Sequence, residues 1–205
     1  MTREAAMPMG DGGISASRNA APEVKEHLPG DPDVWVFVIG ELVVFAAYFG
    51  AYMVDRGRNP ELFLQSQQLL SQGLGVINTL VLLASSLFVA LSVQAARTAD
   101  VRTASRWLAL GGACGAAFAL IKCVEWYSKL RVGLTISTNA FFMHYYMMTG
   151  VHLFHMLLGL VILAILWREI HTSAPRAHVI ESGACYWHVI DLLWVVIFAL
   201  LYLMR

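Results

Sequence analysis

The sequence contains few charged residues. Lys, Arg, Asp and Glu make up 14% of its 205 residues, whereas a soluble domain carries roughly 25%. Hydrophobic residues make up 58%, and the mean hydropathy is +0.62. Because so few charges cannot cover the surface of a globular protein in water, the composition favours an integral membrane protein.

The chain also lacks an excess of charge of either sign, and it contains little cysteine. Fourteen Lys and Arg balance fourteen Asp and Glu, which excludes the strongly basic surface typical of nucleic-acid-binding proteins. The three cysteines, Cys114, Cys123 and Cys185, lie in apolar runs without C-x-x-C or metal-ligand spacing. We expect them to be small buried hydrophobic residues, and we expect no disulfide framework.

Residues 1–30 lack an apolar run and are rich in Gly, Pro, Ala and charge. A secretory signal peptide needs an apolar stretch near its start, so this segment does not fit one. We expect a flexible tail. The remaining residues, 31–205, are expected to form a single membrane domain.

Five long apolar segments follow the tail, at residues 34–54, 75–96, 107–127, 139–167 and 183–204. A helix needs about 20 apolar residues to cross a bilayer. None of the segments shows the alternation of a membrane β-barrel. The sequence therefore predicts an all-α integral membrane bundle of five transmembrane helices. The connection at residues 55–74, which contains ELFLQSQQLL, is either an interfacial helix or a plain loop.

Lys and Arg are unevenly distributed over the connections. They are more numerous on the side that holds the N-terminal tail and the second and fourth connections. Positive residues concentrate on the cytoplasmic side of membrane proteins. We therefore expect a cytoplasmic N-terminus and an external C-terminus.

Several ionisable residues lie within the predicted spans. A charged side chain at the centre of a membrane costs about 2.5–3.5 kcal/mol on insertion scales, so these groups are expected to face protein, headgroups or water. Lys122 and Glu125 are one helical turn apart and could form an ion pair. The full set is Glu41, Lys122, Glu125, His144, His152, His155, His188 and Asp191.

The polar residues of the last two spans share helix faces. His144, Met148, His152, His155 and Gly159 follow steps of four, four, three and four residues, which is one stripe on a helix. We expect these faces to meet inside the bundle. The matching stripe of the fifth span, with His188 beside it, is Trp187, Asp191, Trp194 and Phe198.

Three interpretations of the stripes remain open from the residues alone: a hydrogen-bonded structural network, a lipid-headgroup or proton-linked role, and a metal or haem site. His152 or His155 together with His188 could ligate a b-type haem. The nearby carboxylates suit hydrogen bonding better than iron ligation. The spacing of His144, Met148 and His152 is only a weak match to a metal site, so we expect no metal on this chain.

The motifs resemble subunit III of the haem-copper oxidases. SGACYWHVIDLLWVVIFALLYL is similar to the last helix of that family, with its W-H-x-x-D-x-x-W pattern, and TGVHLFHMLLG is similar to its T-G-x-H-x-x-H-x-x-x-G segment. IGELVVFAAYFGAY, NTLVLLASS and IKCVEWY resemble further family segments in the same order. With room for five helices instead of seven, the chain resembles the short branch. That branch includes quinol oxidase subunit III and the NorE-type proteins that accompany nitric oxide reductase.

The resemblance implies an accessory membrane subunit without catalytic residues. Its partner would be the catalytic subunit of a haem-copper oxidase or nitric oxide reductase in a bacterial cytoplasmic membrane, and haem and metal would reside on that partner. It also implies bound phospholipid and support for proton uptake. The alternative is an independent redox protein with a bis-histidine b-haem.

The resemblance also implies roles for the polar residues of the spans. The buried polar network would comprise Glu41, Glu125, His152, His155, His188 and Asp191. In it Glu41 would bond to a histidine of the fourth span, His188 would pair with Asp191, and the histidines and Asp191 would join the fourth and fifth spans. The lipid or proton-linked residues would be Glu41, Lys122, His144 and Trp187.

Overall fold

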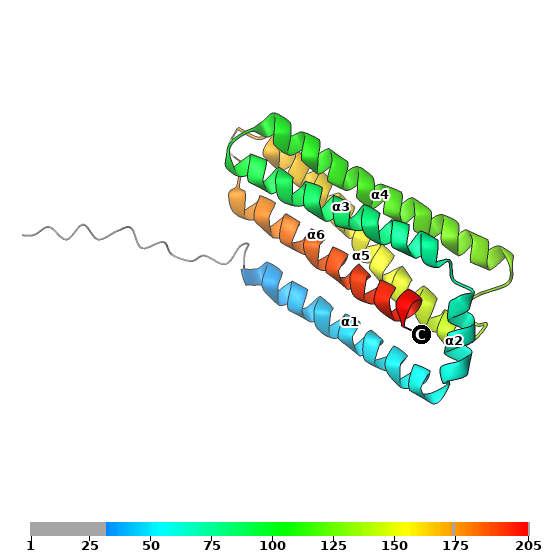
Figure 1. Cartoon of the computed structure of the whole chain (residues 1–205). Helices are drawn as coiled ribbons and strands as arrows, with labels where there is room; N and C mark the ends of the chain where they lie inside the picture. Colours follow the sequence, from blue (N-terminus) through cyan, green and yellow to red (C-terminus); the bar gives the residue numbers. More distant parts are fainter. Residues whose placement is uncertain (1–31, 174, 205) are drawn as a thin grey trace, which may run out of the picture.

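Five long helices lie side by side in the computed structural model, which describes residues 32–173 and 175–204 (Figure 1). A short helix crosses one end of the bundle, and the last helix continues into a π-helical turn. No strand occurs in the described part of the chain. The elements are α1 (Pro32–Arg58), α2 (Pro60–Gln68), α3 (Gln72–Arg97), α4 (Val101–Arg131), α5 (Ala140–Ile170), α6 (Ala177–Phe198) and η1 (Ala199–Leu203).

The predicted all-α bundle of five membrane helices is confirmed. Each predicted span corresponds to one long helix, and all five are long and apolar enough to cross a membrane. The connection at residues 55–74 contains the helix α2, so the helical alternative is correct, while its position at the membrane interface stays a prediction. The tail predicted at residues 1–30 lies outside the described residues.

Side-chain caps begin two of the helices, α4 and α5. Asp100 accepts a hydrogen bond from the backbone N–H of Thr103 at 3.1 Å, and Asn139 accepts one from Phe142 at 3.0 Å. Both bonds satisfy a backbone donor that the first turn of a helix leaves free. Hydrogen bonding from Thr103 also lowers the pKa of Asp100 below its ordinary value.

Small residues let α3 and α4 approach closely. The Ser85 hydroxyl donates to the carbonyl of Gly111 at 2.7 Å, and the Ser92 hydroxyl donates to the carbonyl of Ala104 at 2.8 Å. A methyl group on Gly111 would lie 2.9 Å from the Val89 side chain. In the G-x-x-x-G spacing, Gly111 therefore lies at the α3–α4 contact, whereas Gly115 faces α6.

The α6 helix forms the centre of the bundle. In the most apolar 18-residue stretch of α6 and η1, 61% of the residues are buried, compared with 17% in the corresponding stretch of α1. The indole of Trp187 lies against both Gly115 of α4 and Gly159 of α5, where an added methyl would meet it at 2.6 Å and 2.9 Å. The glycines thus make room for a fully buried tryptophan between three helices.

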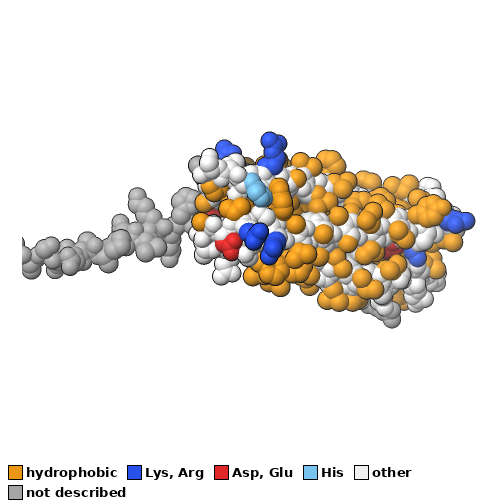
Figure 2. Space-filling model, turned by 90° about the horizontal axis from the view of Figure 1, so that it is seen from above, with side chains coloured by type: hydrophobic (Ala, Val, Ile, Leu, Met, Phe, Trp, Pro, Cys, Tyr) orange, Lys and Arg blue, Asp and Glu red, His pale blue; other side chains and the backbone are white. Residues whose placement is uncertain are grey.

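Apolar side chains cover most of the outer surface along the length of the bundle, and the Lys and Arg side chains gather towards its ends (Figure 2). The prediction that the cysteines are buried is wrong. Cys123 is exposed on this surface, and Cys114 and Cys185 are partly exposed. A bilayer solvates apolar groups on the outside, so in this protein hydrophobic character does not imply burial.

We expect Gly115→Ala to destabilise the bundle by about 1–3 kcal/mol, because its methyl must displace the rigid Trp187 ring. Gly112→Ala is the matched control, since nothing lies within 4 Å of its added methyl. Thermal unfolding in mild detergent would compare them. Equal melting temperatures for the two variants would show that the Trp187 seat does not limit stability.

Candidate functional site

The α1 and α5 helices are joined by a carboxylate and an imidazole. Glu41 Oε2 lies 2.9 Å from His155 Nε2. The other ring nitrogen, Nδ1, lies 2.7 Å from the backbone carbonyl of Val151. This is the pairing expected between Glu41 and a histidine of the fourth span.

The geometry of this pair implies a bound proton. A carbonyl oxygen only accepts hydrogen bonds, so Nδ1 of His155 must carry the hydrogen that bonds to Val151. The contact between Nε2 and Glu41 then needs a second proton, carried either by an imidazolium or by a protonated carboxyl group. In both forms the pair as a whole is neutral, which suits its position in the membrane.

A second buried site joins α4 to η1. Lys122 Nζ donates to Glu125 Oε2 at 2.9 Å and to the Tyr202 hydroxyl at 2.7 Å. The same hydroxyl donates to Glu125 Oε1 at 2.6 Å, which closes a ring of three side chains. The predicted ion pair is therefore formed, and Tyr202 is a third member that the sequence analysis missed.

Aromatic rings surround this ion pair. Lys122 is 1% exposed, and its ammonium lies 5.0 Å from the ring centres of Tyr145 and Trp194 and 5.2 Å from that of Tyr202. Desolvated cation–π contacts of this kind stabilise a buried ammonium. Such burial keeps Lys122 away from the lipid-facing surface, so of its two expected roles only the proton-linked one remains a prediction.

The π-helical turn η1 brings Tyr202 to this site. A π-turn disrupts the regular helical hydrogen bonds, and side chains from distant helices bond to its carbonyls. The Tyr52 hydroxyl of α1 donates to the carbonyl of Leu200 at 2.9 Å, and the Gln72 amide of α3 donates to that of Tyr202 at 2.7 Å. Together with Lys122 of α4, these contacts from α1 and α3 fix the position of Tyr202.

The expected pairing of His188 with Asp191 is wrong. His188 Nδ1 lies 2.7 Å from the hydroxyl of Ser86 on α3. Asp191 lies near the same hydroxyl. Among the described residues, neither of its carboxylate oxygens has a hydrogen-bond partner of normal geometry. These two residues therefore face α3 and do not join α5 to α6. The Ser85-Ser86 pair inside an apolar span was the available signal for this contact.

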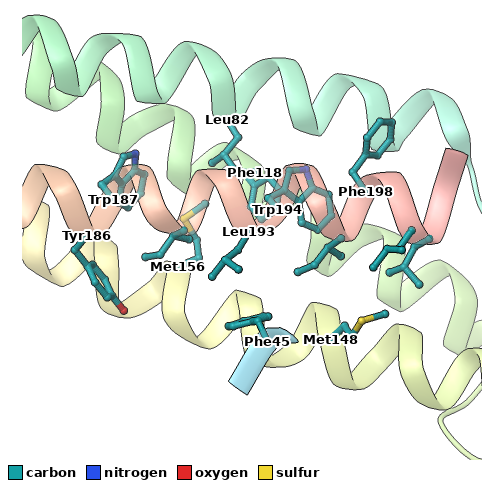
Figure 3. Close-up of a cluster of buried hydrophobic side chains, with 14 of the residues drawn as sticks. Phe45, Leu82, Phe118, Met148, Met156, Tyr186, Trp187, Leu193, Trp194 and Phe198 are labelled. Carbon is teal, nitrogen blue, oxygen red and sulfur yellow. The ribbon is translucent and has the colours of Figure 1, made fainter. Parts of the chain in front are cut away.

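His152 also differs from its predicted role in a histidine–carboxylate network. It is fully buried, and within the described residues neither of its ring nitrogens has a hydrogen-bond partner. Its ring centre lies 5.7 Å from that of Phe118 and 5.3 Å from that of Trp194. Figure 3 shows these two neighbours among the buried side chains of the core. The stripes of α5 and α6 do meet, but at this level they meet through ring packing.

The remaining expected site residues have structural contacts. His144 Nε2 lies 2.9 Å from Asp55 Oδ2, which joins α5 to the end of α1. The indole of Trp187 donates to the Ser85 hydroxyl at 3.2 Å, and its full burial excludes contact with lipid at the outer surface. Asp55 was missed because it lies just after the apolar run of the first span.

The contacts of His155 and His188 bear on the haem alternative. Both nitrogens of His155 are engaged, by Val151 and Glu41, and Nδ1 of His188 is engaged by Ser86. A bis-histidine haem requires two imidazoles with free nitrogens that converge on one iron. His155 is therefore not free to ligate iron, and the absence of haem from this chain stays a prediction.

Comparison with known proteins agrees with this fold and these motifs. Residues 31–205 match the family described as cytochrome c oxidase subunit III. The chain belongs to the cytochrome c oxidase subunit III family. It is 32% identical over 188 residues to cytochrome c oxidase subunit 3 of Thermostichus vulcanus, an alignment that covers 87% of this chain and 92% of the relative. It is 31% identical over 208 residues to cytochrome c oxidase subunit 3 of Synechocystis sp., with 96% and 88% covered.

A quinol oxidase subunit is also among its relatives. Cytochrome bo(3) ubiquinol oxidase subunit 3 of Buchnera aphidicola is 25% identical over 174 residues, with 83% of this chain and 91% of the relative covered. The resemblance to the haem-copper oxidase subunit III family is thus confirmed. An association with nitric oxide reductase stays a prediction, since the names of these relatives refer to oxidases.

We expect the Lys122–Glu125 pair to be strongly coupled in its effect on stability. Lys122→Met should cost about 3–5 kcal/mol, because it leaves the fully buried Glu125 carboxylate without its cation. Adding Glu125→Gln should recover most of that loss, since the neutral amide can still accept the Tyr202 hydrogen bond. Denaturant unfolding in detergent would measure the cycle. Additive losses in the double variant would contradict a charged pair.

We expect Glu41→Gln to retain nearly all of the stability, because its amide N–H can donate to Nε2 of His155 in place of the shared proton. Glu41→Leu should cost about 1–3 kcal/mol, since it leaves the imidazole unpaired. Melting temperatures in detergent would test the pair, and infrared spectra would follow its carboxyl signal. If both variants lost stability equally, the hydrogen bond would not be what joins α1 to α5.

Proposed function

We propose that this protein is the accessory, non-catalytic subunit III of a haem-copper terminal oxidase, bound within the membrane to the catalytic subunit that carries haem and metal. The family match over residues 31–205 is the observation that carries this proposal. Relatives with more than four fifths of their own length covered are oxidase subunits 3. The chain itself performs no redox chemistry.

The polar sites support a role in holding the bundle in one arrangement. They connect α1 to α5, α4 to η1, and α3 to α6, so each helix that flanks the core has at least one polar contact with another helix. A rigid bundle of this kind can stabilise a larger catalytic subunit by packing against it. The bound proton of the Glu41–His155 pair is the feature most consistent with a proton-linked contribution.

The proposal extends to the surroundings of the protein. The bilayer would be the cytoplasmic membrane of a bacterium, with the N-terminus on the cytoplasmic side. This orientation is consistent with the greater number of Lys and Arg on that side of the sequence. Phospholipids would contact the apolar outer surface and stabilise the complex.

We expect the tagged full chain to co-purify from native membranes in mild detergent with a large haem-bearing subunit. Mass spectrometry would identify the partner, and a visible spectrum would show its haem. Purification of the chain alone without colour would contradict the accessory role. Purification of the chain alone with a Soret band would instead support the haem-protein alternative, and a nitric oxide reductase in the eluate would replace the oxidase as partner.

A further inference from the structure

Three polar side chains around the Lys122 ion pair have atoms without a hydrogen-bond partner of normal geometry among the described residues. They are Asn78 of α3 and Tyr145 and His152 of α5, and each is 0% exposed. Both ring nitrogens of His152, both amide atoms of Asn78 and the Tyr145 hydroxyl are unpaired in this sense. Folded proteins rarely leave buried polar atoms unpaired, because such atoms lose their hydrogen bonds to water without replacement.

The Lys122 ammonium has one hydrogen to donate as well. An ammonium carries three N–H donors, and Glu125 and Tyr202 accept two of them. Within the described residues, no oxygen or nitrogen accepts the third. The Tyr145 ring centre lies 5.0 Å from Nζ, and its hydroxyl lies near Glu125 and Tyr202. The unpaired hydroxyl and the third N–H therefore belong to one site.

The imidazole of His152 borders the same site. Its ring centre lies 5.3 Å from that of Trp194, and the Lys122 ammonium lies 5.0 Å from the centre of the same indole. The Phe118 ring, about one turn before Lys122 on α4, lies against both His152 and Trp194. Lys122 is also close enough to His152 for its charge to act on the imidazole.

Asn78 lies level with these side chains on α3. About one turn before it, a methyl group added to Gly75 would meet the Tyr202 ring at 2.9 Å. Directly after it, the Thr79 hydroxyl accepts a hydrogen bond from the Trp194 indole at 3.1 Å. The fully buried Asn78 amide therefore lies between the levels of Tyr202 and Trp194, and it adds a polar group from a third helix.

The unpaired groups include both donors and acceptors. The ammonium only donates, a neutral imidazole donates through one nitrogen and accepts through the other, and the hydroxyl and the amide do both. A metal cation or a second amine would be repelled by Lys122, and an apolar molecule would leave every group unpaired. Water donates and accepts in several directions, and a buried water makes about three hydrogen bonds to groups of this kind.

We propose that the bundle core binds water at this site, between the Lys122 ion pair and the imidazole of His152. The bound water accepts from the third N–H of Lys122 and connects it to the polar side chains of α5 and α3. The site joins three helices through hydrogen bonds that no direct contact supplies, where the bilayer excludes bulk water. It concerns the interior of this chain and does not depend on which catalytic subunit the chain binds.

Radiolytic labelling of the full chain in mild detergent tests the site. An X-ray pulse splits water into hydroxyl radicals that react before they diffuse far, so a fully buried side chain is oxidised only beside a bound water. Trp187 and Trp194 are a matched pair, because both are 0% exposed on the same helix and only Trp194 borders the site. In oxygen-18 water we expect mass spectrometry to find the label on Trp194 and none on Trp187. Labelling of neither tryptophan, or equal labelling of both, would overturn the proposal.

Two phenol variants show whether the polar groups hold the water. Tyr145→Phe removes a hydroxyl from the site and should reduce the labelling of Trp194. Tyr186→Phe is the matched control, since its hydroxyl is also unpaired among the described residues but lies about two turns of α6 away from Trp194, beside Phe37 of α1. This variant should label Trp194 as the unmodified chain does. Equal labelling of Trp194 in the two variants would count against the site.

The order of stability of two His152 variants gives an independent test. Glutamine keeps a donor and an acceptor for the bound water, so His152→Gln should exceed His152→Phe about tenfold in the folding equilibrium constant, the factor for one buried hydrogen bond. In a dry core the order would reverse, because phenylalanine leaves no polar atom unpaired and keeps the ring contacts with Phe118 and Trp194. Denaturant unfolding in detergent would measure both variants, and the reversed order would overturn the proposal. Labelling of the unmodified chain remains a test even where a variant fails to fold.

Discussion

The absence of water inside a bilayer is the constraint on which the interior of this bundle depends. A polar group there has only other protein groups as partners. Lys122 illustrates the consequence, since its ammonium is 1% exposed and is bonded both to a carboxylate and to a phenol. The phenol comes from η1, so the polar group also fixes the position of that turn.

The packing of α6 against its neighbours follows from the same constraint. No hydrophobic effect drives helices together in lipid, so close packing and interhelical hydrogen bonds must do so. Trp187 and Trp194 supply both, because each ring packs in the core while its N–H donates to a serine or threonine of α3. Gly115 and Gly159 supply the space for Trp187. Large and small residues on neighbouring helices are thus complementary parts of one contact.

The positions of the helices could be predicted from the sequence, whereas most of their pairings could not. Span length and apolarity depend on single segments, and these gave all five helices. Helical periodicity also placed the Trp187–Phe198 stripe inside. Periodicity does not say which neighbour a face meets, and so His188 was expected to pair with Asp191 on its own helix, although it lies against Ser86 of α3. The Lys122–Glu125 pair was predictable because both residues lie on one helix, while its third member, Tyr202, lies 80 positions away from Lys122.

The attachment of α1 differs in kind from that of the other helices. Only 17% of the residues in its most apolar 18-residue stretch are buried, so the area that α1 packs against the core is small. Its contacts with the rest of the bundle include three polar links along its length: Glu41 to His155, Tyr52 to the carbonyl of Leu200, and Asp55 to His144. Two of these links contain an imidazole, whose hydrogen bonds depend on its protonation state. The position of α1 therefore depends on these polar contacts more directly than does that of a helix held by apolar packing.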